Sequence, residues 1–245
     1  MHRVGVDFSG AEDGGGHKIR VASWRAGEEV VAARTDRRGL VRLITESAQR
    51  GEPSLWRIDA PGGIPRATIR EHGATQDWLA AAKWMHSFGS PRAWRTALRS
   101  VSRVEPRRQT DLDRHAPLAP MNLRVFKQTW TFVAEILLPL HNAGVSIEPM
   151  APRQSPCVVC EGCPASVLIA RGWPSHKYKG GGEPPARVRR TIASALVESG
   201  IPLRRALVEE AVADEQGDLL DAFVLLGPEF FGAVSTDGIV EGWIY

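Results

Sequence analysis

Acidic residues stand where the strands and helices of this sequence are expected to end together. Asp7 lies in the first strand-like run, and Asp59 closes a later apolar run. Asp218 and Asp221 are three positions apart, a spacing that puts both side chains on one helix face. Buried carboxylates are unfavourable unless they are paired or bound to a metal. The pattern therefore predicts a divalent-metal site formed by Asp7, Asp59, Asp218 and Asp221.

Such a site suits the hydrolysis of a phosphodiester bond. Two metal ions about 3.5–4 Å apart activate the attacking water, stabilise the transition state and assist the leaving oxygen. Mg²⁺ prefers oxygen ligands and keeps several waters, so a few carboxylates suffice, and Mn²⁺ is the alternative ion. Glu161 follows another apolar run and is a further candidate catalytic acid. No Ser–His or Cys–His pair is evident, which favours water attack over a covalent mechanism.

Each acid also has a structural explanation. Asp59 precedes Ala60 and Pro61 and could be a turn residue, while Asp218 could be a helix N-cap that accepts backbone N–H bonds. Asp7 has few such explanations within the segment VGVDFSG, and Asp221 lies among apolar residues. The acids are therefore catalytic candidates of unequal weight.

Basic residues near the acids indicate contact with nucleic-acid phosphates. Arginines recur along one predicted helix, for which a solvated helix face is the alternative explanation. Other basic residues follow Asp59 and Glu161 in predicted loops, where Tyr178 could stack on a base. The candidate nucleic-acid contacts are Arg66, Arg92, Arg95, Arg99, Arg103, Lys177 and Lys179.

The composition of the 245-residue chain is ordinary for a globular protein, with 43% hydrophobic and 24% charged residues and a net charge of +3. No apolar run approaches the roughly 18 residues that span a bilayer. The N-terminus lacks the apolar core of a signal peptide, so we expect cytoplasmic residence and no membrane partner. Cys157, Cys160 and Cys163 form a poor disulfide framework, which fits a reducing compartment, and metal binding by them is an alternative.

The apolar periodicity predicts an α/β chain. The first three strand-like runs are expected to form an antiparallel meander, with a turn at 13–16. A predicted helix over 38–50 leads into the fourth run, and such a crossover makes that strand parallel to the first. The strand-like runs are residues 3–8, 17–24, 28–34, 55–59, 145–148 and 157–161.

The region between the fourth and fifth runs is expected to be mostly helical. Ser90 is a predicted N-cap with Pro91 at the first helical position. A long apolar face ends near Gly144, and Pro139 is expected to kink or shorten that helix. The last helix is expected to begin near Asp218, and the C-terminal five residues are predicted to form an edge strand or a docking tail.

The chain resembles the domain of unknown function 429 family, a group of predicted nucleases in the ribonuclease H-like superfamily. The segments that carry the resemblance follow the family's order over nearly the whole chain. They are VGVDFSG (4–10), IDAPGGIPR (58–66), VVCEGCPA (158–165), YK (178–179), DLLDA (218–222) and EGWIY (241–245).

The resemblance implies one ribonuclease H-like domain over 1–245, an α/β fold with a mixed five-stranded sheet flanked by helices. It also implies a helical insertion between strands 4 and 5, at about 66–144, and Asp7, Asp59, Glu161 and Asp221 as the acidic positions. Holliday-junction resolvases of the same superfamily are similar in ending with an acid pair on the last helix, here Asp218 and Asp221. The chain departs from the family at CEGCP (160–164) and at Pro228, which interrupts the final helix.

The leading hypothesis is therefore a Mg²⁺- or Mn²⁺-dependent nuclease that acts on DNA or RNA. A phosphotransferase of the actin or sugar-kinase type is an alternative, because it shares the superfamily's core. Against it, only one of the two duplicated halves of those kinases is visible in the sequence. A catalytically silent module that binds nucleic acid or protein is the third possibility, which the presence of the acids disfavours.

Overall fold

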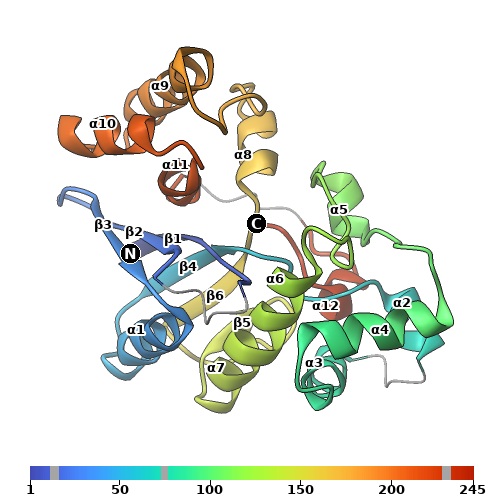
Figure 1. The fold of residues 1–245 in the computed structure, drawn as a ribbon. Helices are drawn as coiled ribbons and strands as arrows, with labels where there is room; N and C mark the ends of the chain where they lie inside the picture. Colours follow the sequence, from blue (N-terminus) through green and yellow to red (C-terminus); the bar gives the residue numbers. More distant parts are fainter. Residues whose placement is uncertain (12–16, 73–76, 228–232) are drawn as a thin grey trace.

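The computed structural model describes residues 1–11, 17–72, 77–227 and 233–245. The turn expected at 13–16 and the effect of Pro228 on the last helix lie outside these residues. The described chain is an α/β fold, in which helices cover both faces of a mixed six-stranded sheet (Figure 1). Among the described residues, no helix has the length and apolar character needed to cross a membrane.

The sheet has the strand order β3-β2-β1-β4-β6-β5. The antiparallel meander of β1, β2 and β3 is confirmed, as is the parallel pairing of β4 with β1. The strands are β1 (His2–Asp7), β2 (Ile19–Arg25), β3 (Val31–Thr35), β4 (Ser54–Asp59), β5 (Ser146–Glu148) and β6 (Cys157–Gly162).

The expected count of five strands is wrong because β5 adds a sixth strand at the edge of the sheet. It is only three residues long and pairs in parallel with β6, while Ile147 also forms a single antiparallel bridge with Ala151. A short edge strand exposes few unpaired backbone groups, and this bridge pairs one residue on its outer side. The helical segment α2 to α7 lies between β4 and β5 in the chain.

Helices pack on the two faces of the sheet and enclose two hydrophobic cores. One face is covered by α8 (Pro164–Ala170), α9 (Glu183–Glu198), α10 (Arg205–Ala213) and α11 (Asp218–Val224). The other carries α1 (Arg37–Gln49), α6 (Phe126–Thr131), the π-helical turn η1 (Phe132–Leu137) and α7 (Leu138–Asn142). The remaining helices, beside the sheet in Figure 1, are α2 (Arg66–Glu71), α3 (Trp78–Ser87), α4 (Pro91–Val101), α5 (Gln109–Asp113) and α12 (Gly238–Glu241).

Local sequence signals explain two of these helices. The Ser90 hydroxyl accepts the Ala93 N–H at 3.2 Å, and Pro91 is the first residue of α4, as predicted. The long apolar helix is interrupted at η1, which ends just before Pro139. Proline has no N–H to bond the carbonyl four residues earlier, and π-helical turns absorb such a break.

A glycine in β1 allows α11 to lie directly on the sheet. A Cβ atom at Gly5 would lie 2.1 Å from the carbonyl oxygen of Ala222, far inside contact distance. The Arg57 side chain is buried on β4 and donates to the Leu225 carbonyl at 2.8 Å, just after α11. Side chains alternate along a strand, so Asp7 shares the face of Gly5 that α11 covers.

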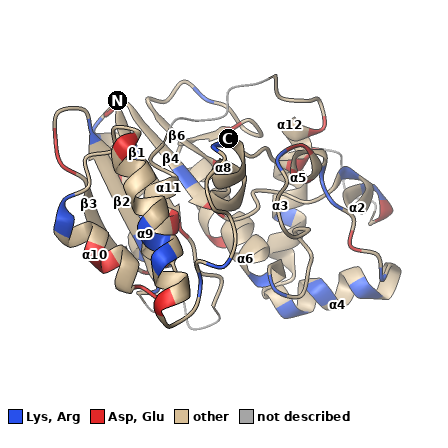
Figure 2. Ribbon diagram, turned by 90° about the horizontal axis from the view of Figure 1, so that it is seen from above, with Lys and Arg blue, Asp and Glu red and all other residues tan. Residues whose placement is uncertain are grey.

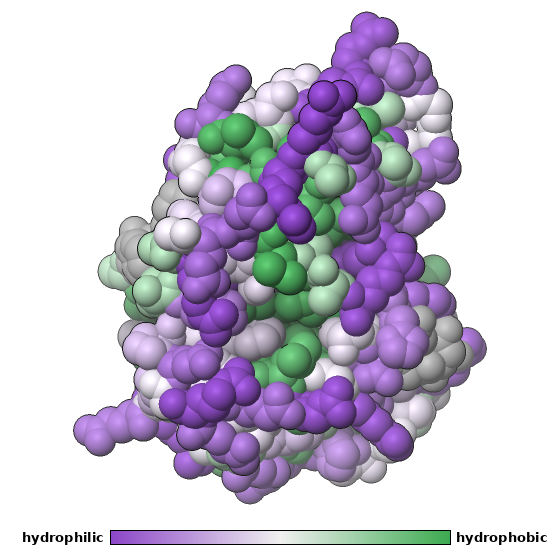
Figure 3. Space-filling view, turned by 90° about the vertical axis from the view of Figure 1, so that its left-hand side faces the viewer, coloured by the Kyte–Doolittle hydropathy of each residue, from purple (hydrophilic) through white to green (hydrophobic). Residues whose placement is uncertain are grey.

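The outer edge of the meander is partly apolar. Apolar residues gather in the middle of the side that lies on the left of Figure 1, and hydrophilic residues surround them (Figure 3). Val31, on the edge strand β3, is 60% exposed. This edge is separate from the strand ends that carry the acids.

Candidate metal centre

Three aspartates converge at the ends of β1 and β4 beneath α11. Asp7 and Asp59 are the last residues of two neighbouring parallel strands and are paired in register. They therefore project side by side on the face that α11 covers, and Asp221 comes from the first turn of α11. One carboxylate oxygen from each residue lies within 4.8 Å of the others. These three residues are close enough to hold a metal ion.

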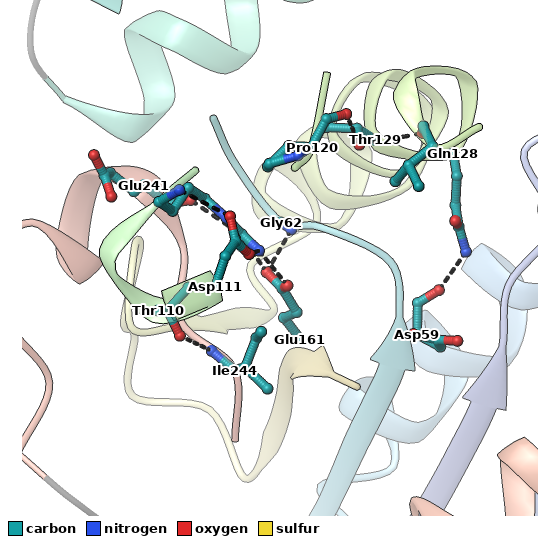
Figure 4. Close-up of polar contacts among 12 residues, drawn as sticks. Asp59, Gly62, Thr110, Asp111, Pro120, Gln128, Thr129, Glu161, Glu241 and Ile244 are labelled. Atoms are coloured by element: carbon teal, nitrogen blue, oxygen red, sulfur yellow. Dashed lines mark hydrogen bonds and ion pairs between the residues drawn. The ribbon is translucent and has the colours of Figure 1, made fainter. Parts of the chain in front are cut away.

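A glutamine from α6 holds the two strand ends together. The Gln128 side-chain amide donates to the carbonyl oxygens of Phe8 and Asp59, at 2.9 and 2.6 Å. Figure 4 shows this side chain reaching the backbone at Asp59. Gln128 belongs to the helical insertion, and nothing in its local sequence indicates this role.

Two neighbouring side chains orient the buried Asp221 carboxylate. The Tyr178 hydroxyl donates to Oδ1 at 2.9 Å, and the Lys179 Nζ lies 2.7 Å from Oδ2. The Tyr178 ring packs against the core around α9 and α11 and is mostly buried, while the residue also lines the cavity that contains Asp59 and Asp221. Arg189 on α9 donates to the Tyr178 carbonyl at 2.7 Å, which fixes the loop that carries both residues.

The convergence of carboxylates raises their pKa values. Burial, followed by repulsion from Asp221, raises the pKa of Asp59 to about 8. The same two causes, with Asp59 as a further one, place the pKa of Asp7 well above its ordinary value. Burial also raises the pKa of Asp221, although Lys179 opposes the shift. This mutual repulsion is what a bound divalent cation relieves.

We expect the metal-free protein to lose stability as the pH rises from about 4 to 8. Asp59 has a pKa of about 8 in the fold against an ordinary value of 3.8, so the folded chain keeps a proton that the unfolded chain releases. The stabilisation is complete below the lower value and is lost as the pH rises through the higher one. Asp59→Asn should therefore raise the melting temperature by roughly 4 °C at pH 8, a gain of about 1–2 kcal/mol. The gain should be smaller at pH 5.

Melting curves recorded in a chelator between pH 5 and 8.5 measure this effect. The exposed Glu46 on α1 offers a matched control through Glu46→Gln, since it lies outside the aspartate cluster. A difference between Asp59→Asn and wild type that is the same at every pH would contradict the expectation.

Asp218 lies beside the cluster but does not join the three close carboxylates. It is also not the N-cap of α11, because Gly217 occupies that position with a positive φ of 76°. Burial, then repulsion from Asp214, raises the pKa of Asp218. Asp218 lines the same cavity as Asp7, so it faces the same space without meeting the other acids.

Glu161 does not join the cluster because it points to the other face of the sheet. It pairs in register with Ile58, whereas Gly162 pairs with Asp59, so alternation turns Glu161 away from the aspartates. Its carboxylate lies 2.6 Å from Arg108 and accepts the Gly62 N–H at 2.7 Å. Figure 4 shows Glu161 directed toward Gly62 and separated from the Asp59 side chain. Burial raises the pKa of Glu161, and Arg108 opposes this shift.

The C-terminal residues dock against this ion pair. The Tyr245 N–H donates to the Glu161 carbonyl at 3.1 Å, and the Ile244 N–H donates to the Thr110 hydroxyl at 3.0 Å. The Glu241 carboxylate accepts the Arg66 N–H at 2.6 Å. Of the two structures expected for this segment, a docking tail is therefore the one observed, with a single bridge between Glu161 and Ile244.

The predicted arginine stripe on α4 does not face the aspartates. Arg95 and Arg99 both pair with Glu105, and Arg95 also lies 4.9 Å from the centre of the Phe126 ring. Figure 2 shows α4 with its bands of basic residues at the opposite end of the molecule from α10. Arg92 and Arg103, also on this stripe or just after it, are exposed and do not line the two cavities beside the aspartates.

Of the remaining basic candidates, two lie at the site and one does not. Lys177 and Lys179 line a cavity together with Asp59 and Asp221. The Arg66 guanidinium instead pairs with Asp237 at 2.9 Å. The sequence therefore identifies the basic residues next to Tyr178 more successfully than those on the helical stripe.

Basic residues that the sequence does not single out line another cavity, which lies beside Asp7. Its volume is about 620 Å³, and Arg34 and Arg124 are two of its exposed residues. They come from β3 and from the segment before α6, which are far apart in the sequence. No spacing signal could have joined them, because only the folded sheet brings these segments together.

The three cysteines do not form a metal site. All are buried free thiols, and Cys157 and Cys160 are three residues apart on β6, so their side chains point to opposite faces. Within the described residues, the group close enough to hold a metal ion is the three aspartates. Burial raises the pKa of the Cys163 thiol to about 12, which opposes the thiolate form that binds metals.

The donor set of the aspartate cluster fits a hard divalent cation. All three candidate ligands are carboxylate oxygens, which Mg²⁺ prefers, and no sulfur or imidazole takes part.

Comparisons with known proteins do not assign a family or a function to the chain. No protein-family model matches the chain, and neither the curated proteins nor the solved structures include a match.

Proposed function

We propose that this protein is a metal-dependent nuclease that hydrolyses phosphodiester bonds of DNA or RNA. The observation that carries the proposal is the convergence of Asp7, Asp59 and Asp221 between two cavities that basic residues line. Carboxylates that hold cations attract a phosphate through the ions, while basic side chains hold the neighbouring phosphates.

Each residue of the site has a distinct role in this proposal. Asp7, Asp59 and Asp221 would hold Mg²⁺ or Mn²⁺, which when bound supplies an activated water and charge stabilisation. Tyr178 and Lys179 hold the Asp221 carboxylate in one orientation from the loop before α9. Asp218 faces the cavity beside Asp7 and is the candidate to accept a hydrogen bond from the attacking water.

The fold supports a ribonuclease H-like assignment. An antiparallel meander is followed by parallel strands, and acids end β1 and β4 beneath a C-terminal helix that carries Asp221. On this basis we propose the ribonuclease H-like fold that the resemblance to the domain of unknown function 429 family implies. In this proposal β5 is an addition at the sheet edge, and Glu161 supports the loop after Asp59 through Gly62.

A cleavage screen tests the proposal. Single-stranded, duplex, hybrid and branched nucleic acids are incubated with the protein in Mg²⁺, in Mn²⁺ and in a chelator. We expect cleavage of at least one substrate in the presence of metal and none in the chelator. Failure to cut any of the four substrate classes would contradict the proposal, and ATP hydrolysis or stabilisation by ATP would favour the kinase alternative.

A further inference from the structure

Two separate cavities reach the aspartates, and they share no lining residue. The first has a volume of about 620 Å³ and is lined by Asp7 and Asp218. The second has a volume of about 430 Å³ and is lined by Asp59 and Asp221. Both volumes fall in the range of ligand sites, about 300–1,000 Å³. The three aspartates therefore lie between the two cavities.

The sheet order places these cavities on opposite sides of the β1–β4 pair. The first cavity is lined by Arg34 on β3, and β2 and β3 lie on the outer side of β1. The second is lined by Cys163 and Pro164, which follow β6 on the outer side of β4. A path from one cavity to the other therefore crosses the ends of both strands, at Asp7 and Asp59.

Exposed basic residues line both cavities. Arg34 and Arg124 line the first, and His176 and Lys177 line the second. Contacts from Lys and Arg to phosphates dominate non-specific nucleic-acid affinity. A nucleic-acid strand that extends in both directions from the aspartates can contact basic side chains in both cavities. A substrate bound by its end needs such contacts in one cavity only.

The backbone at the second cavity is held in an unfavourable conformation. His115 and Lys177 both line it, with positive φ angles of 55° and 62°. Residues other than glycine adopt this region infrequently, and such residues cluster at ligand clamps. His115 is the left-handed residue just after α5, a common way for a helix to end, whereas Lys177 lies in the loop before α9.

We propose that the substrate is an internal segment of one nucleic-acid strand, which passes from the first cavity to the second across the aspartates. Cutting would then be endonucleolytic. Water attacks phosphorus, one P–O bond of the strand breaks, and the leaving oxygen takes up a proton from that water. One new end carries the phosphate and the other a hydroxyl. This inference rests on the proposed nuclease function.

Circular substrates have no strand ends, so they distinguish internal cutting from degradation that begins at an end. Closed circles of single-stranded DNA and RNA are compared with linear strands of the same sequence that carry a label at one end, in Mg²⁺ and in Mn²⁺. We expect circles to be opened at a rate similar to internal cutting of the linear strands. Stepwise shortening of linear strands with intact circles would overturn the inference and leave the nuclease proposal standing. Absence of cutting on both would overturn both proposals.

Binding measurements test the two-sided path independently of cutting. Fluorescence anisotropy of a labelled 20-nucleotide strand is recorded in Ca²⁺ for Arg124→Gln, which alters the first cavity, and Lys177→Asn, which alters the second. Asparagine tolerates the positive φ of position 177. Each variant should lower affinity about 3–10-fold and reduce the salt dependence by roughly one counterion.

The matched control is Arg42→Gln. The Arg42 side chain is 73% exposed on α1, on the face of the sheet opposite α11, and it lines neither cavity. It should leave affinity unchanged. Loss of affinity in only one of the two cavity variants, or an equal loss in the control, would overturn the two-sided path.

Discussion

Asp7→Asn is expected to abolish metal-dependent cleavage and to make the metal-free protein more stable. Asparagine has the same shape as aspartate but lacks the charge that burial, Asp221 and Asp59 disfavour in the metal-free fold. The same change removes one of the three carboxylates that could hold a metal. We expect cleavage to fall at least about 10³-fold, which corresponds to roughly 4 kcal/mol of transition-state stabilisation.

Two measurements separate these effects. The rate of cleavage reports the catalytic loss, and melting temperature with and without Mn²⁺ reports metal binding. Wild type should gain stability from Mn²⁺, because binding to the folded state alone stabilises it. Asp7→Asn should melt higher than wild type in a chelator and gain little from Mn²⁺. Glu46→Gln, which removes a carboxylate on α1 whose side chain is 45% exposed, should match wild type in cleavage rate and in melting temperature with and without Mn²⁺.

A variant that keeps cleavage within tenfold of wild type would show that Asp7 is not part of the metal site. Full stabilisation by Mn²⁺ in Asp7→Asn would contradict the assignment in the same way. A variant that fails to fold is distinguished from both by its melting curve, and Asp221→Asn then provides a second test from a different element.

Arg108→Met is expected to cost about 3–5 kcal/mol of stability, since breaking a buried ion pair leaves an uncompensated charge. The Arg108 side chain is only 1% exposed and lies 2.7 Å from Asp111 and 2.6 Å from Glu161. It also donates to the Glu241 carbonyl at 3.2 Å, so it joins α5, β6 and the C-terminal tail. Methionine leaves both carboxylates buried without their cation.

Urea denaturation at several pH values measures this loss. It should shrink as the pH falls, because protonation of Glu161 removes the unpaired charge, and burial already raises the pKa of that group. Arg205→Met, at an arginine that is 92% exposed, should change stability by less than about 0.5 kcal/mol. A loss below about 1 kcal/mol for Arg108→Met would mean that the pair contributes little beyond a hydrophobic replacement.

Glu161 resembles a catalytic acid in the sequence but lies in a buried ion pair in the structure. It follows an apolar strand in the same way as Asp59, and both are the kind of residue that ends a strand at an active site. One position of register separates them, because Ile58 pairs with Glu161 and Asp59 pairs with Gly162. A shift of one residue reverses the face to which a side chain points. Register between distant strands cannot be read from either strand alone.

The parts of the fold that local rules govern were predictable. The meander, the helix after it and the parallel β4 follow from alternation, turn residues and the crossover rule. These rules bring Asp7 and Asp59 together, because neighbouring parallel strands that end in register present their last side chains together. The N-cap at Ser90 follows in the same way from adjacent residues.

The sequence by itself determined that acids end β1 and β4 and that α11 carries Asp221, since these depend on residues close together in the chain. Only the tertiary structure decided which acids meet, through the close approach of α11 that Gly5 permits and the register that turns Glu161 away. It also decided that the α4 arginines pair with Glu105 while Arg34 and Arg124 line the cavity beside Asp7. The physical reason is that charge pairing and cavity lining depend on distances between segments that are remote in sequence.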